Sequence, residues 1–243
     1  MVQKSGRSDP SKGLAGGKSS KAAAKAAESG KAAVAPPPGA PPRKRGRPRA
    51  FEPEVALKKA LAAFRKSGFS ATSLDDLSAA MGINRPSLYG TFGDKRELFL
   101  KAYQRYRAET NALFAPALDP KLTLRQMLEM VYATAINIYL SGDHGPSGCF
   151  TVMTAASEAM SDPEIRAIVQ KAIENSDRTI AGRFRAAMEQ GELPPKTDCD
   201  ALARIVSASI QSIAIRSRAH VPRAELEAMA RSTIDLVAGP ARR

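Results

Sequence analysis

Residues 73–92 constrain the fold more strongly than any other stretch of this chain, because two short helix patterns meet there across a three-residue turn. Ser73 followed by Asp76 forms a capping-box-like pair that predicts the start of a helix. The apolar residues of this helix share one face and are Leu74, Leu77 and Met81. Asn84, a favourable N-cap, follows after the turn that contains Gly82. Two short helices around a Gly-containing turn of this length form a helix-turn-helix pattern.

Helices are also predicted on both sides of this pattern. An earlier helix is expected to stop near Gly68, and its apolar stripe consists of Leu57, Ala60, Leu61 and Phe64. In the helix after Asn84, Leu88 and Phe92 are four residues apart and face inward, and Pro86 is tolerated in the first turn. A further helix begins at Asp94.

The outward face of the helix after Asn84 has the chemistry of a DNA-reading surface. This face is expected to present Arg85, Ser87, Tyr89, Gly90 and Thr91, with no neighbouring acidic group before Asp94. Arginine can pair with guanine, hydroxyl groups can reach base edges or phosphates, and glycine permits close approach of the backbone. Lys95 at the start of the next helix is expected to engage phosphate together with the N-terminal amides. Ser73 completes the predicted DNA-contact set. The alternative is an ordinary small helical bundle with a solvated polar face.

Residues 51–110 resemble the N-terminal domain of tetracycline-repressor-type (TetR/AcrR) regulators. The resemblance is carried by three runs in unbroken spacing: Gly68-Phe69-Ser70-Ala71-Thr72-Ser73-Leu74, Ala79-Ala80-Met81-Gly82-Ile83, and Ser87-Leu88-Tyr89-x-x-Phe92 followed by Asp94-Lys95-x-Glu97-Leu98. It implies a three-helix helix-turn-helix DNA-binding domain over residues 50–110. It also implies a helical ligand-binding and dimerisation domain over residues 111–243. Pro86 and Gly90 depart from the residues common at these positions in the family.

Residues 1–49 form a basic tail with a different composition. They carry 12 basic and 2 acidic side chains and no Phe, Tyr, Trp or Ile, so we expect disorder in isolation. The tail ends in Arg43-Lys44-Arg45-Gly46-Arg47-Pro48-Arg49, which resembles an AT-hook. Arg45 and Arg47 are therefore predicted to enter an A·T minor groove. A generic solubilising or phosphate-binding run is the other interpretation.

Residues 111–243 read as successive helices, so the predicted fold is all-α throughout. In this half, a small-molecule effector pocket is predicted between the central helices. The residues proposed to line it are Met127, Val131, Tyr132, Ile136, Tyr139, Phe150 and Met153. Each of them fits a role as ordinary core equally well. Small residues on a late helix, Ala208, Ser209, Ser212 and Ala214, suit close helix approach either in a homodimer or within one chain.

Several other classes of protein are excluded by the sequence. The chain has 2 Cys and 2 His without zinc spacing, so neither a disulfide framework nor a built-in metal site is expected, and no cofactor is predicted. Cys149 fits either an oxidant sensor or an inert small apolar residue. No apolar run approaches the ~20 residues of a membrane span, and the basic N-terminal residues lack the apolar stretch of a secretory signal, which favours the cytoplasm and association with the nucleoid. No catalytic motif rises above chance, so the chain is not expected to be an enzyme.

Two functions remain, and both use double-stranded DNA. The leading prediction is a ligand-responsive repressor that binds a palindromic operator as a homodimer, since one recognition helix reads too few base pairs. The alternative is an architectural protein of weak sequence specificity, in which the basic tail dominates binding. The net charge of +13 is compatible with either function.

Overall fold

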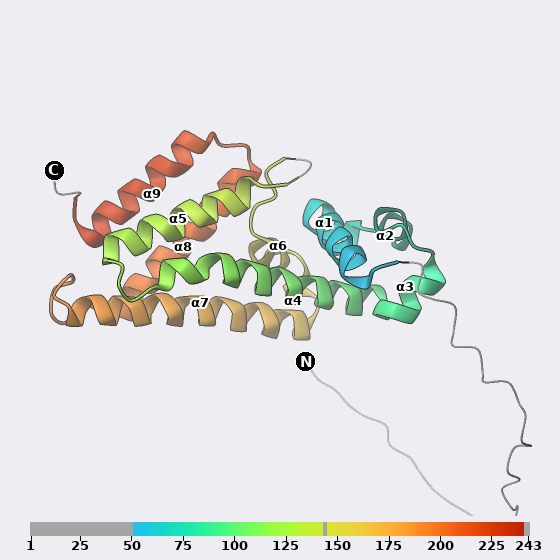
Figure 1. The fold of residues 1–243 in the computed structure, drawn as a ribbon, viewed down its shortest axis with the longest axis horizontal. Coiled ribbons are helices and arrows are strands. Elements are labelled where there is room, and N and C mark those ends of the chain that lie inside the picture. The colour runs from blue at the N-terminus through green and yellow to red at the C-terminus, as the bar shows by residue number, and fades with distance from the viewer. Residues whose placement is uncertain (1–50, 143–144, 241–243) are drawn as a thin grey trace, which may run out of the picture. The chain divides into compact units, whose positions relative to one another are not determined.

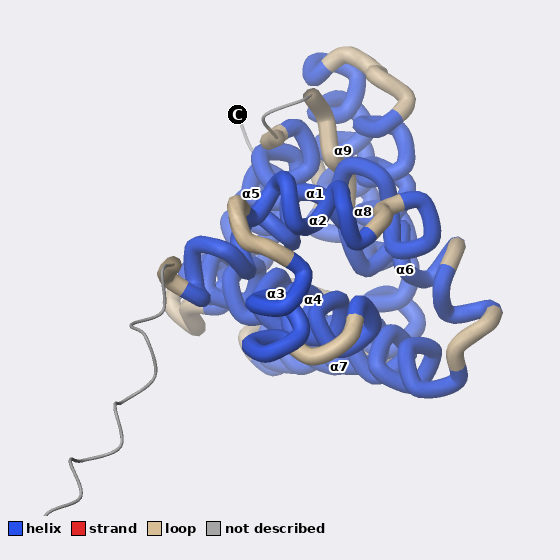
Figure 2. Tube along the Cα trace, turned by 90° about the vertical axis from the view of Figure 1, so that its right-hand side faces the viewer, coloured by secondary structure: helices blue, strands red, loops and turns tan. Residues whose placement is uncertain are grey.

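The computed structural model describes residues 51–142 and 145–240. The basic tail, with Arg45 and Arg47, lies outside the described residues. Within them, every regular element is a helix, which confirms the all-α prediction (Figure 1, Figure 2). The elements are α1 (Pro53–Ala71), α2 (Leu74–Met81), α3 (Arg85–Phe92), α4 (Lys95–Phe114), η1 (Ala115–Leu118), α5 (Leu124–Leu140), α6 (Phe150–Ala156), η2 (Glu158–Met160), α7 (Pro163–Glu189), α8 (Cys199–Arg218) and α9 (Arg223–Ala238).

Local hydrogen bonds explain where the helices around the turn begin and end. Ser73 with Asp76 and Asp94 with Glu97 both form complete capping boxes at the starts of α2 and α4. The backbone leaves the helical conformation at Gly68, where φ is 80°, and one further turn leads to Ala71. The regular helix therefore stops at Gly68, as predicted, and a separate short turn continues α1 to Ala71.

The first four helices pack around an aromatic core that extends into the second half of the chain. Phe64 and Phe99 are fully buried, and their rings meet edge to face at 5.2 Å. Phe150 at the start of α6 lies against Phe99 at 5.5 Å and against Tyr106 at 5.6 Å. Phe150 therefore packs α6 directly against α4, the helix that follows α3.

A second core fills the space between α5, α8, α9 and the C-terminal part of α7. Its largest buried side chains include Tyr132, Met127 and Phe184. Helix α7, at 27 residues, packs along α8, and it runs beside α4 in the lower part of Figure 1. The residues of α4 and α7 that face each other frame the pocket described below.

Candidate functional site

Helix α3 is built to present a polar face while its other face is locked into the core. The side chain of Asn84 accepts a hydrogen bond from the backbone N–H of Ser87 at 2.9 Å, as predicted for the N-cap. Leu88 is fully buried and Phe92 is 4% exposed, so they fix the rotation of the helix about its axis. Arg85, at the first position of the helix, is exposed.

The remaining predicted DNA contacts on α3 also lie at or near the surface. Tyr89 is 48% exposed, an unusual state for a large aromatic side chain. Gly90 is exposed, and a Cβ added there would meet no atom within 4 Å, so packing does not require glycine at this position. Ser87 and Thr91 are half-buried. The structure thus brings these four residues together with Arg85 on one helix.

An acidic neighbour of Arg85 was missed by the sequence reasoning. Asp75 of α2 accepts hydrogen bonds from Arg85 Nε at 3.0 Å and from Arg85 Nη2 at 2.7 Å. The expectation that no acidic group lies near the face before Asp94 is therefore wrong. It failed because Asp75 is ten positions earlier in the chain and is brought close only by the turn between α2 and α3.

Ser73 and Lys95 flank this face and already have partners within the chain. The Ser73 hydroxyl donates to Asp76 Oδ2 at 2.6 Å and accepts from the backbone N–H of Asp76, so capping occupies it. Lys95 is half-buried, and its Nζ lies 4.4 Å from the ring centroid of Phe69. This cation–π contact holds the charge at the first turn of α4.

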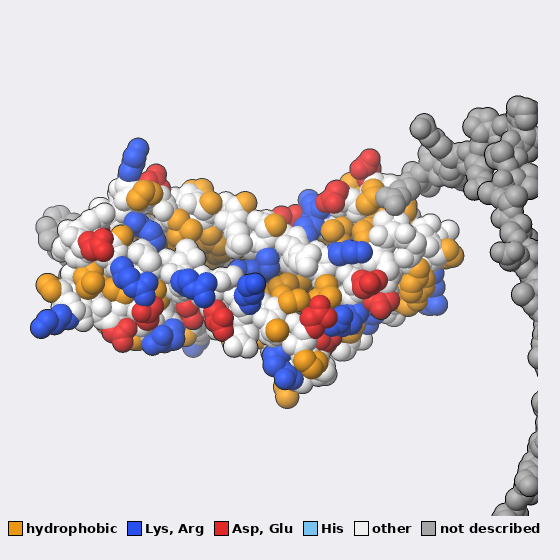
Figure 3. Space-filling model, turned by 90° about the horizontal axis from the view of Figure 1, so that it is seen from below, with side chains coloured by type: hydrophobic (Ala, Val, Ile, Leu, Met, Phe, Trp, Pro, Cys, Tyr) orange, Lys and Arg blue, Asp and Glu red, His pale blue; other side chains and the backbone are white. Residues whose placement is uncertain are grey.

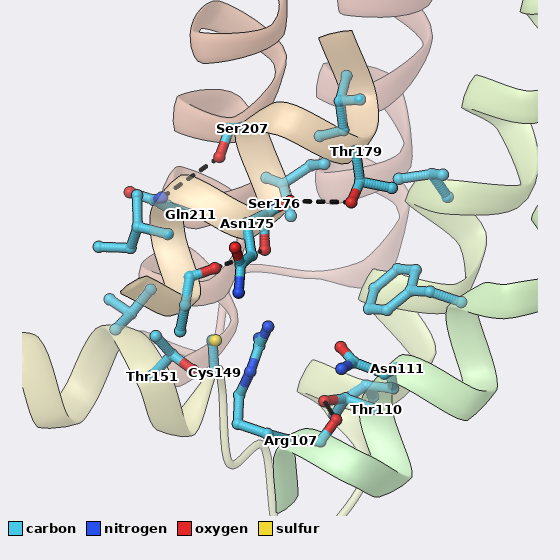
Figure 4. A pocket seen from close by; sticks show the side chains of 18 of the residues that line it. Arg107, Thr110, Asn111, Cys149, Thr151, Asn175, Ser176, Thr179, Ser207 and Gln211 are labelled. Carbon is cyan, nitrogen blue, oxygen red and sulfur yellow. Dashed lines mark hydrogen bonds between the residues drawn. The ribbon is translucent and has the colours of Figure 1, made fainter. Parts of the chain in front are cut away.

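The second feature of interest is a cavity of about 460 Å³ between α4, α5, α6, α7 and α8 (Figure 4). Its volume falls within the range of ligand pockets, roughly 300–1,000 Å³. Buried Val131, Tyr139 and Ser207 lie at its inner side. Exposed Asn111 and Asn175 lie at its outer side, so the cavity opens to solvent between α4 and α7.

Only two of the seven residues predicted to line a pocket, Val131 and Tyr139, line this cavity. Met127 and Phe150 are each 1% exposed and pack within the two cores, and Tyr132 and Ile136 border a separate shallow depression against α9. Met153 is half-buried on α6. None of these five residues lines the cavity. Most of them point inward as predicted, but they pack against neighbouring helices where no space is left.

The residues that sequence reasoning missed include a group of polar side chains. Helix α4 contributes Arg107, Thr110 and Asn111, and α7 contributes Asn175, Ser176 and Thr179. A signal for the second group was present in the sequence. The three polar residues of α7 interrupt the apolar stripe between Ala172 and Ile180, where a fully packed helix would continue it.

Two tyrosines and a cysteine meet at the end of the cavity nearest the first four helices. The Tyr106 hydroxyl donates to Cys149 Sγ at 3.6 Å and accepts from the backbone N–H of Phe150 at 3.3 Å. Burial, with the neighbouring Cys149 as a further cause, raises the pKa of Tyr106 and of Tyr139 well above the ordinary value of 10.0. Both phenols are therefore neutral in the physiological range and can donate hydrogen bonds.

Polar contacts connect the first four helices to the second half of the chain. Arg96 of α4 pairs with Asp162 at 2.6 Å and with Glu164 at 2.6 Å, both at the start of α7. The guanidinium of Arg96 lowers the pKa of Asp162 to about 2. Arg65 of α1 donates to the hydroxyl of Ser147. These contacts give α4 and α1 defined positions against the loop after α5 and the start of α7.

Charge is mixed over the body outside these contacts. On the face shown in Figure 3, basic and acidic side chains alternate, in line with 15 of each among residues 111–243. Across the part of the chain that the structure describes, no three His, Cys, Asp or Glu residues gather as a metal site, and no helix could span a membrane.

Comparison with family models gives two matches that follow one another along the chain. Residues 56–102 match the model described as bacterial regulatory proteins, tetR family. Residues 114–233 match the model described as tetracyclin repressor-like, C-terminal domain. The first range contains α2 and α3, and the second contains most of the residues around the cavity.

Curated relatives match over most of their length. The chain is 30% identical over 193 residues to the HTH-type transcriptional repressor ComR of Escherichia coli (strain K12), which covers 79% of this chain and 91% of that protein. It is also 30% identical over 169 residues to the uncharacterised HTH-type transcriptional regulator YezE of Bacillus subtilis (strain 168), which covers 69% of this chain and 87% of that protein.

Among solved structures, the chain is similar to a cysteine mutant of the TetR family transcriptional regulator CifR, which was solved in complex with 26bp double-strand operator DNA. Its TM-score is 0.72 at 28% identity, and the match covers 79% of this chain and all of that one. A regulator from Chloroflexus aurantiacus J-10-FL has a TM-score of 0.70 at 22% identity, over 77% of this chain and 94% of that one. The latter likeness concerns the fold alone.

Proposed function

Because this chain belongs to the tetR family of bacterial transcriptional regulators, we propose that it is a repressor that binds a palindromic operator as a homodimer and releases it when a small molecule occupies the cavity. One observation carries the DNA-binding part of this proposal. Helix α3 is fixed by its cap and by Leu88 and Phe92, and it presents Arg85 and Tyr89 to solvent. A rigid, exposed helix of this kind fits the major groove.

The names of similar proteins support a repressor acting on an operator. ComR and BdcR of Escherichia coli are both described as repressors, and CifR was solved on operator DNA. These similarities favour the regulator over the architectural alternative, and the two family models match residues 56–102 and 114–233, outside the basic tail.

Exposed apolar side chains on the last two helices support the homodimer. Ile205 and Ile215 on α8 are 60% and 59% exposed, and Leu236 on α9 is 86% exposed. Ile205, Ala208, Ser212 and Ile215 follow one another at helical spacing, which makes a continuous stripe along α8. Of the four small residues noted in the sequence, Ala208 and Ser212 belong to this stripe, whereas Ala214 is buried against its own chain and Ser209 contacts Tyr132. A second copy is the natural cover for such a stripe.

The cavity and α3 are linked through α4. The same helix contributes Arg107 to the cavity wall and Lys95 beside α3. A ligand that displaces α4 changes the separation of the two recognition helices, which must lie about 34–36 Å apart to read successive major grooves. Release by about 100-fold requires roughly 2.7 kcal/mol of preference for the non-binding form.

Footprinting of the purified protein on the DNA upstream of its own gene tests the proposal. We expect a protected region with two-fold symmetry, and loss of that protection in the double variant Arg85→Ala with Tyr89→Ala. Circular dichroism and light scattering establish that this variant remains folded and dimeric. Protection without symmetry, or protection that survives in the double variant, would contradict the proposal.

A further inference from the structure

Arg107 is the only charged side chain among the described residues that line the cavity. Its guanidinium makes no hydrogen bond and no ion pair with any residue that the structure describes. Figure 4 shows this side chain extending from α4 into the cavity, toward Asn175 of α7 and beside Cys149. Arg107 is half-buried, so its charge is partly removed from water.

The rest of the lining separates into an apolar inner part and a polar outer part. Ile138 and Tyr139 of α5 are buried, and Ile173 of α7 lines the same space. Asn111 and Asn175 supply neutral amide groups near the opening. No Asp or Glu of the described lining competes for the Arg107 charge.

These features select the charge of a ligand. A carboxylate can accept two parallel hydrogen bonds from a guanidinium, and the attraction is strengthened where water is partly excluded. A neutral ligand of the same size leaves the guanidinium partly desolvated without a partner. An ammonium group is repelled by it.

We propose that the effector of this regulator is an apolar carboxylic acid, with its carboxylate on Arg107 and its hydrocarbon body against Ile138, Tyr139 and Ile173. This inference rests on the proposed function, because it names the class of ligand for the cavity that controls DNA binding. The side-chain NH2 groups of Asn111 and Asn175 donate hydrogen bonds to the carboxylate oxygens.

Calorimetric titration with three probes of equal length, decanoate, decanol and decylamine, tests the ligand class on the full-length protein. Calorimetry is suitable because the chain contains no Trp to report binding by fluorescence. We expect decanoate to bind about 10- to 100-fold more tightly than decanol, the range for a charge-assisted hydrogen-bonded pair, and decylamine to bind least. Equal affinity for decanoate and decanol would overturn the proposal without any variant.

Three variants locate the binding. Arg107→Gln is expected to remove the preference for the acid, so that decanoate binds no better than decanol. Arg107→Lys keeps a charge and is expected to retain part of the preference. Lys171→Gln, which removes one positive charge from the exposed side of α7, is the matched control and should behave as wild type. Wild-type affinity for decanoate in Arg107→Gln would place the carboxylate elsewhere and refute the assignment.

The same proteins are then measured on the footprinted operator by fluorescence anisotropy, which separates failure of this inference from failure of the proposed function. Operator binding that decanoate weakens in wild type but not in Arg107→Gln supports both. Intact operator binding with no decanoate binding overturns only the carboxylate assignment. Absence of specific operator binding overturns the repressor function itself, whatever the probes do.

Discussion

Arg85 on the DNA-reading helix is held by Asp75 of the preceding helix through two hydrogen bonds, at 3.0 and 2.7 Å. Both side chains are more than half exposed, so the pair contributes only about 0–1 kcal/mol to stability. Its consequence concerns DNA binding. To contact a base, the Arg85 guanidinium must break its hydrogen bonds with Asp75 or divide its N–H donors between Asp75 and the base. The Asp75 carboxylate also repels the DNA phosphates and so opposes binding.

Replacement of Asp75 by Asn is therefore expected to strengthen operator binding. Without the Asp75 carboxylate, Arg85 does not have to give up an ion pair before it contacts DNA. We therefore expect the dissociation constant for the operator to fall about twofold to fivefold. Fluorescence anisotropy on labelled operator measures it. The same replacement in an Arg85→Gln background should have a smaller effect. If the gain is equal in both backgrounds, it arises from net charge and not from the pair.

Replacement of Asn84 by Ala is expected to lower the free energy of unfolding by about 1 kcal/mol. The backbone N–H of Ser87 loses the acceptor that now lies at 2.9 Å, so the first turn of α3 is uncapped. Urea denaturation gives the value. Ser87→Ala is the control, because it keeps the cap while removing a proposed DNA contact. We expect weaker operator binding in both variants and a loss of stability only in the first.

The pair between Arg96 and Asp162 predicts a dependence of stability on pH. The folded chain holds the pKa of Asp162 at about 2, against an ordinary value of 3.8. A lowered pKa means that folding stabilises the charged form of the Asp162 carboxyl relative to its neutral form. Its contribution is therefore complete above pH 3.8 and is lost as the pH falls toward about 2.

Wild type and Asp162→Asn are expected to differ in the free energy of unfolding above pH 3.8 and to converge as the pH approaches about 2. Urea denaturation across this window measures the difference. The absence of any gap between the two proteins across the window would show that Asp162 acts through its cap on α7 alone, since an Asn side chain can replace that acceptor.

The AT-hook-like run predicts a distinct effect on DNA with A·T-rich flanks. Replacement of both Arg45 and Arg47 by Ala should weaken binding to such operators more than to G·C-flanked ones, because the narrow minor groove attracts arginine. It should also reduce the slope of log K against log salt by roughly 0.9 for each phosphate that is no longer neutralised by arginine. Replacement of Lys12 and Lys18 by Ala removes the same charge outside the run. An equal drop in affinity in both double variants would favour the generic basic interpretation.

Signals local to the sequence predicted the helices and most of their ends. The capping pairs at Ser73 and Asp94 and the single cap at Asn84 act over three residues, and the apolar period identifies the inward face of each helix. Both signals depend on residues that are close in sequence, so they can be recognised without knowing which helices pack together in the fold. The exposed face of α3 followed from the same period, because Leu88 and Phe92 fix which side of that helix faces inward.

The neighbours that lie against each helix face became known from the packed fold. It brought Asp75 to Arg85, and it placed Met127 in the core while leaving open space beside Arg107 and Asn175. The apolar period says that a side chain points inward. Whether the space there is filled depends on the positions of four other helices, which follow from packing between residues far apart in the chain.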